Sequence, residues 1–272
     1  MSGKTYVGNT SGKSAKPKKI YVGNSSNKAT LVKKIYVGNS SNKAVKVWPN
    51  SILPDAYQRV EFIRNTNQES YISTDLTSIN NYTTLYFDFA ITTFRDSSYG
   101  SMEPESNSFG LQAGYKSSNN YYLFGLITPS SGVIEMVVPY DTVSPRSSWN
   151  YYKKVATVNY TVGSRHKILF NQTGGKFYYD NNNVGSTDAT YNLLSNINFP
   201  LFGFRTYTNY FYGGPAVNLY QFSAWQNGTL VRDMYPCYRI SDNVTGMYDI
   251  VNDVFYTNSG SGTFYKGPNV EG

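Results

Sequence analysis

Apolar and polar residues alternate along most of the chain, and a period of two residues predicts β-strands. The longest alternation covers residues 83–94, and shorter ones follow at 134–138, 154–162 and 165–171. Glycine and asparagine separate these stretches, and no segment keeps the period of 3.6 residues that is typical of a helix. The pattern therefore predicts an all-β fold.

Two polar segments predict tight turns between neighbouring strands. Asp-Asn-Asn-Asn at 180–183 separates two apolar stretches, and Asn227-Gly228 lies in the middle of the apolar stretch 216–234. Asparagine and glycine tolerate the positive φ angles that two-residue hairpin turns require. Many short strands joined by such turns are typical of a β-sandwich or a jelly roll.

The first 47 residues consist of three near-copies of one 15-residue unit. The sequence KKIYVGNSSNKA occurs at 18–29 and again at 33–44, and a divergent copy begins at Gly3. Each copy predicts a hairpin with NSSN as its turn. A single hairpin is marginal in water, so the units must stack on one another or on other chains. We expect an anchor or shaft; a flexible linker is the alternative, which the regular Ile, Tyr and Val positions disfavour.

The composition changes after the repeats and predicts a domain boundary. Residues 48–53 form a proline-containing junction, and residues 54–272 are long enough for one large β domain, which we expect, or for two small ones. Residues 1–47 carry ten lysines and no acidic residue, whereas the rest of the chain has 14 basic and 17 acidic residues. We expect these lysines to cover a solvated strand face rather than to bind nucleic acid, because nearly all aromatic residues lie in the acidic part.

Cysteine content and hydropathy limit the setting of the protein. Cys237 is the single cysteine, so no intrachain disulfide can form. The first residues, MSGKTYVG, lack the apolar core of a signal peptide, and no stretch approaches ~20 apolar residues. We therefore expect no signal peptide and no membrane span, and release by another route such as cell lysis.

The chain beyond the junction resembles a module found at the ends of many phage tail, fibre and prophage proteins. Five segments carry the resemblance: 53–76, 165–171, 176–186, 227–239 and 246–264. The repeats are similar to the KKIYVG repeats that often precede this module. The resemblance implies a concanavalin A-like, laminin G-like jelly roll that binds carbohydrate. The turn at 180–183 departs from the usual Asp-Gly, and residues 96–120 match nothing in the module.

Residue types with catalytic or metal-binding potential are sparse. A catalytic triad would need His166, the single histidine, which the alternation instead predicts to be a packed or hydrogen-bonded strand residue. Glu103 and Glu105 are the closest carboxylate pair, but they flank a proline in a polar loop rather than sharing a strand. We expect no enzyme and no cofactor; calcium is an alternative, through Asp180 and Asp188.

Aromatic residues give the strongest functional signal, with 27 Tyr, 15 Phe and 3 Trp. A tyrosine offers a ring that stacks on the C–H face of a sugar and a hydroxyl that forms hydrogen bonds. Segments 115–122, 149–152 and 205–214 place rings beside Asn, Ser or Gly and are predicted to be loops. The candidate glycan-binding residues are Arg205, Tyr207, Asn209, Tyr210, Tyr212, Tyr115, Tyr121, Tyr122, Trp149 and Tyr151. Packing in the core or in a protein interface would use the same residues.

These observations together predict a bacteriophage virion appendage protein, such as a tail or head fibre, located at the virion surface. Residues 1–50 would attach it to other virion proteins and hold a homo-oligomer, with a trimer preferred. The lectin-like head would bind glycans on the bacterial surface and act in receptor binding. The alternative is a structural decoration protein whose head makes protein–protein contacts only.

Overall fold

The chain divides into two units, Met1–Ile52 and Leu53–Glu271, and the second unit is called the head below. The computed structural model describes residues 21–23, 29–31, 35–38, 44–48, 52–77, 79–94, 108–117, 120–139, 150–172, 174–190, 192–193, 198–205 and 211–270. These residues form strands and no helix, so none of them belongs to a helix that could cross a membrane. The prediction of an all-β chain is confirmed.

The described residues of the first unit form two antiparallel strand pairs. Its strands are β1 (Tyr21–Gly23), β2 (Ala29–Leu31), β3 (Ile35–Gly38) and β4 (Ala44–Trp48). Tyr21 lies opposite Leu31 in the β1–β2 pair. Val37 lies opposite Val45 in the β3–β4 pair. The first repeat, within residues 1–20, lies outside the described residues.

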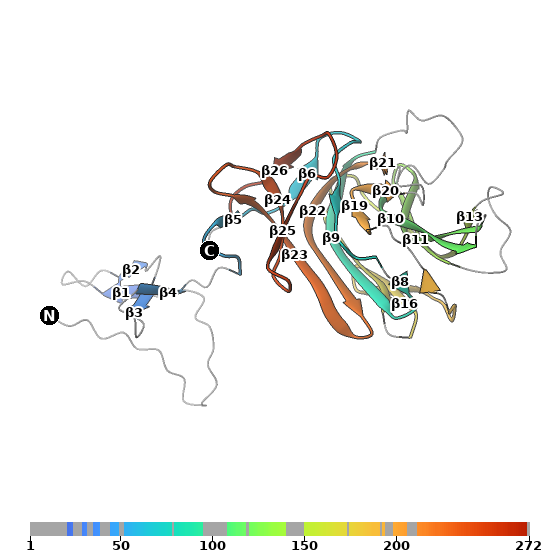
Figure 1. Ribbon diagram of the computed structural model, residues 1–272, viewed down its shortest axis with the longest axis horizontal. Helices are drawn as coiled ribbons and strands as arrows, with labels where there is room; N and C mark the ends of the chain where they lie inside the picture. The colour runs from blue at the N-terminus through green and yellow to red at the C-terminus, as the bar shows by residue number, and fades with distance from the viewer. Residues whose placement is uncertain are drawn as a thin grey trace. The chain divides into compact units, whose positions relative to one another are not determined.

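The larger sheet of the head has eleven described strands, and its neighbours pair antiparallel. They are β5 (Tyr57–Arg59), β6 (Ile63–Asn65), β9 (Thr83–Thr93), β15 (His166–Gln172), β16 (Lys176–Tyr179), β17 (Asn182–Ser186), β22 (Ala216–Gln226), β23 (Thr229–Arg239), β24 (Thr245–Asp249), β25 (Val254–Thr257) and β26 (Phe264–Lys266). The main order is β17-β16-β15-β9-β22-β23-β24-β25. Figure 1 shows the long strands β9, β22 and β23 side by side.

The smaller sheet has seven described strands in the order β14-β12-β11-β10-β20-β21, with β13 beside β11. They are β10 (Ser108–Ser117), β11 (Asn120–Ser130), β12 (Val133–Val138), β13 (Asn150–Tyr151), β14 (Lys153–Asn159), β20 (Gly203–Arg205) and β21 (Phe211–Gly213). The β10–β20 and β11–β13 pairs are parallel. Two further short pairs are β7 (Ile72–Ser73) with β19 (Pro200–Leu201) and β8 (Ile79–Asn80) with β18 (Asn192–Leu193).

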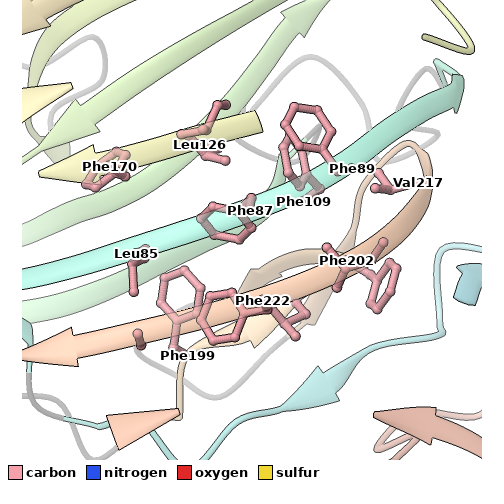
Figure 2. Close-up of a cluster of buried hydrophobic side chains, with 14 of the residues drawn as sticks. Leu85, Phe87, Phe89, Phe109, Leu126, Phe170, Phe199, Phe202, Val217 and Phe222 are labelled. Carbon is pink, nitrogen blue, oxygen red and sulfur yellow. The ribbon is translucent and has the colours of Figure 1, made fainter. Parts of the chain in front are cut away.

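The two large sheets share one apolar core, which is consistent with a β-sandwich. Alternate residues of β9, among them Phe87 and Phe89, are fully buried. They join Phe222 of β22 and Leu126 of β11 in the same cluster (Figure 2). Alternation places every second side chain of a strand on the same face, which explains why the pattern at 83–94 marks the central strand.

Both predicted hairpin turns are confirmed. Asn227 and Gly228 have φ angles of 50° and 77° and connect β22 to β23. Asp180 and Asn181 have φ angles of 47° and 67° and connect β16 to β17. Asparagine and aspartate adopt this left-handed conformation more readily than other residues with a Cβ atom.

Candidate functional site

The structure corrects the prediction that the candidate glycan-binding residues lie in loops. Most of the candidates lie in strands instead: Tyr115 in β10, Tyr121 and Tyr122 in β11, Tyr151 in β13, Arg205 in β20 and Tyr212 in β21. Tyrosine and phenylalanine favour strands, and the pairing of β10 with β11 extends as far as Ser117 and Asn120. The other candidates, Tyr207, Asn209, Tyr210 and Trp149, lie outside the described residues.

Backbone pairing brings two of the three candidate segments together. Tyr115 and Tyr121 are direct cross-strand partners in the β10–β11 pair. Tyr122, the next residue of β11, is the parallel partner of Tyr151 in β13. Partner residues in adjacent strands lie about 4.5–5.5 Å apart, so four tyrosine positions share one end of the smaller sheet.

Of the third candidate segment, the structure describes Arg205 and residues 211–214. Arg205 is the partner of Gln112 in the parallel β10–β20 pair and of Phe211 in the β20–β21 pair. Gln112 precedes Tyr115 by three residues in β10, which is about 10 Å along a strand. We call the positions of Tyr115, Tyr121, Tyr122, Tyr151 and Arg205 the tyrosine end of the smaller sheet.

The middle of the smaller sheet carries buried side chains on both faces. Phe124 belongs to the main core, whereas its neighbour Leu123 belongs to a second buried cluster with Val137 and Tyr152. Glu135 lies in the same region, and its carboxylate accepts a hydrogen bond from Lys154 Nζ at 2.7 Å. Buried side chains therefore occupy both faces of the sheet in this region.

His166 is packed and hydrogen-bonded within the larger sheet. Its Nδ1 lies 2.8 Å from Asp180 Oδ2, and its ring stacks on Tyr179 with the centroids 5.0 Å apart. The second carboxylate oxygen of Asp180 accepts the Lys167 amide at 2.8 Å. Burial, and after it the Asp180 charge, raises the pKa of Tyr179 above its usual value of 10.0. These contacts tie β15 to the β16–β17 turn.

Acidic residues do not gather into a cluster with metal-ligand geometry within the part of the chain that the structure describes. No group of three or more His, Cys, Asp or Glu side chains that could hold an ion is found there. The two carboxylate oxygens of Asp180 form hydrogen bonds with His166 Nδ1 and with the Lys167 backbone amide. Asp188, the second residue named for calcium, lies instead in the wall of a pocket.

This pocket has a volume of about 660 Å³ and was not predicted from the sequence. The pocket is lined by four separate connections of the chain. Each connection contributes at least one lining residue, in order Tyr82, Gly174, Asp188 and Asn227. Each of them has the composition of an ordinary turn, so only the folded arrangement shows that they surround one cavity. Asn-Asn-Tyr at 80–82 is the one local signal, because it places a ring among turn residues.

Comparisons with known proteins add no relative to this picture. A scan against models of known protein families finds none that matches the chain, and a search among curated proteins finds no similar sequence.

Proposed function

We propose that this chain is a bacteriophage virion appendage protein whose head binds glycans on the bacterial surface. In this proposal the head is a concanavalin A-like jelly roll, and residues 1–47 form a hairpin arm. The arm attaches to other virion proteins and assembles the chain as a trimer at the virion surface. The resemblance of the sequence to phage tail and fibre modules supports this setting.

The observation that carries the binding function is that the described parts of the candidate segments belong to one sheet. Segments 115–122, 149–152 and 205–214 are far apart in the sequence, yet the strand order β13-β11-β10-β20 places the positions of Tyr151, Tyr121 and Arg205 in the smaller sheet. A tyrosine ring suits the C–H face of a sugar, and a guanidinium adds several hydrogen-bond donors. Loops and strand ends at one edge of a rigid scaffold are common places for recognition.

Weak single sites are sufficient for adhesion if they are repeated. Stacking of one aromatic pair contributes roughly 0.5–1.5 kcal/mol beyond area burial. A trimeric appendage that occurs many times on one particle binds with an avidity well above the affinity of one head. The proposed function therefore does not require a deep pocket at the tyrosine end.

A glycan array probed with the full-length protein tests the proposal. Tyr121→Ala, and separately the double variant Tyr210→Ala with Tyr212→Ala, should each abolish binding of the glycan that the wild type retains. Tyr265→Ala is the matched control, because this exposed tyrosine lies in β26. Loss of binding in only one of the two test variants would mean that the segments do not form one site.

A protein-binding head is the second candidate, and the surface around Tyr220 of β22 favours it. The Arg165 guanidinium lies 3.9 Å from the centroid of the Tyr220 ring. The ring centroids of Phe62 and Tyr220 lie 5.6 Å apart. Arginine and aromatic residues are enriched in protein interfaces. Under this candidate the wild type binds no glycan, and Tyr220→Ala prevents incorporation into virions.

A further inference from the structure

We infer that the 660 Å³ pocket is a second ligand site, built to bind a neutral saccharide around Tyr82. The pocket is formed by connections of the larger sheet, whereas the tyrosine end belongs to the smaller sheet. The inference holds whether or not the tyrosine end binds glycans.

The position of the pocket follows from the sheet order. β9 lies between β15 and β22, so its first residues lie beside the last residues of both neighbours. Thr83 is the partner of Gln226, which precedes the Asn227-Gly228 turn, and Leu85 is the partner of Phe170, which precedes the β15–β16 connection. The chain after β17 closes the remaining side with Asp188.

Hydrogen bonds hold these connections in place. The buried Asn171 side chain donates to the carbonyl oxygens of Asn81 at 3.2 Å and Thr83 at 2.9 Å. The Asn227 amide donates to the Tyr82 carbonyl at 3.2 Å, and the Thr187 amide donates to the Gly175 carbonyl at 2.8 Å. A pocket whose walls are fixed before binding loses little conformational entropy when a ligand enters.

Tyr82 presents its ring to solvent from a fixed backbone. It is 63% exposed, the largest exposed fraction among the large hydrophobic side chains that the structure describes. Its amide donates to Asn80 Oδ1 at 2.9 Å, and its carbonyl accepts from Asn227. A ligand that covers this ring removes apolar surface from water, and the C–H face of a sugar is a suitable cover.

Two glycines leave open space in the lining of the pocket. A Cβ atom placed on Gly174 or Gly228 would meet no atom within 4 Å, so the space beside their backbone is empty. A ligand can therefore approach the main chain, whose amide and carbonyl groups are hydrogen-bonding partners. The volume lies within the range of about 300–1,000 Å³ that is typical of small-ligand sites.

The lining selects the class of ligand. Asp188 is the one acidic residue among the described lining residues, and neither Lys nor Arg is among them, which disfavours phosphate and other anions. Tyr82 and Ala189 are the two hydrophobic residues among the described lining residues, which disfavours a lipid or an aliphatic ligand. The side-chain amide groups of Asn81 and Asn227 can both donate and accept hydrogen bonds, as the hydroxyl groups of a sugar do. A neutral sugar is the ligand that matches a single ring surrounded by amides.

The test uses full-length protein and an array that contains neutral oligosaccharides and their uronic acid counterparts. The strongest neutral ligand is then titrated by isothermal titration calorimetry into wild type, Tyr82→Ala and the control Tyr265→Ala. We expect Tyr82→Ala to weaken binding about tenfold, because the ring supplies both stacking and buried area. Tyr265→Ala should leave the affinity unchanged, and all three proteins should have the same melting temperature.

Three results would overturn the inference. The first is that the wild type binds no neutral saccharide, and the second is that Tyr82→Ala binds it with the affinity of the wild type. The third result is that the uronic acid counterpart binds as tightly as the neutral saccharide despite Asp188. The variant Tyr121→Ala, at the tyrosine end, separates this site from the proposed function. If that variant loses binding and Tyr82→Ala does not, the tyrosine end is supported and this pocket is rejected; the opposite result supports the pocket and rejects the tyrosine end.

Discussion

Burial keeps several ionisable side chains of the head in their neutral form. Burial raises the pKa of the Cys237 thiol from 9.0 to about 12. It also raises the pKa values of Tyr86 and Tyr256 from 10.0 to about 12, and the Asp88 carboxylate adds to the effect at Tyr86. Each of these groups favours the folded state while it is protonated.

The pH dependence of stability follows from these shifts. The unfolded chain releases the protons near pH 9–10, whereas the folded chain retains them until about pH 12. The free energy of unfolding should therefore be constant up to about pH 9 and fall as the pH rises from 9 to 12. Urea unfolding curves at pH 7, 9, 10 and 11 measure this. Equal midpoints at pH 7 and 11 would contradict the burial of these groups.

The reactivity of the Cys237 thiol gives an independent test of its raised pKa. Native Cys237 should not react with a thiol reagent at pH 8, because it is fully buried and protonated, and it should react when the chain is unfolded. It is the single cysteine, so the reaction reports on one site.

At the scale of elements, the sequence predicted where individual strands lie better than it predicted which strands pair with each other. The alternation at 83–94 corresponds to β9 (Thr83–Thr93), and Asn227-Gly228 forms the predicted turn. Both depend on local chemistry, since alternation fixes a strand face and positive φ fixes a turn. Local chemistry does not determine that β20 pairs with β10 in parallel, because that choice depends on packing between residues far apart in the chain.

The candidate site shows the same division. The sequence indicated which segments are rich in tyrosine. The predicted loops were wrong for the described residues of these segments, because a ring beside asparagine was taken as a sign of a loop although tyrosine favours strands. The pocket around Tyr82 escaped prediction for another reason. Its walls are four short polar connections, and nothing in each one alone distinguishes a ligand site from a turn.

Asn171 connects two elements and provides a test at this scale. Its side chain satisfies the carbonyl groups of Asn81 and Thr83, and its φ of 55° is unfavourable for alanine. Asn171→Ala should lower the free energy of unfolding by about 2–3 kcal/mol, since it leaves carbonyl groups unpaired and strains the backbone. Asn159→Ala, at an exposed position of β14, is the control and should change it by less than about 0.5 kcal/mol. Equal effects in urea unfolding would contradict the connecting role.

At the scale of the whole molecule, the division at Ile52 predicts two separable parts. The β1–β2 and β3–β4 pairs are each too small to be stable alone, so residues 1–50 should hold several chains together. Light scattering should give a trimer for the full chain and a monomer for a 51–272 fragment, and the fragment should unfold in one cooperative transition. Monomers in both samples would contradict assembly through the repeats.

The two ends of the head lie next to each other, because residues near its start pair with residues near its end. β6 pairs with β26, and the Val270 amide donates to the Arg59 carbonyl at 2.9 Å. A domain whose ends meet can be inserted into an exposed turn of an unrelated carrier, or reopened as a circular permutant, without changing the order of its sheets. The exposed turn at Val162 and Gly163 offers one opening point. The head can therefore be transferred from one protein to another as a unit. Only two short connecting segments would be needed, because both ends of the head lie at the same place.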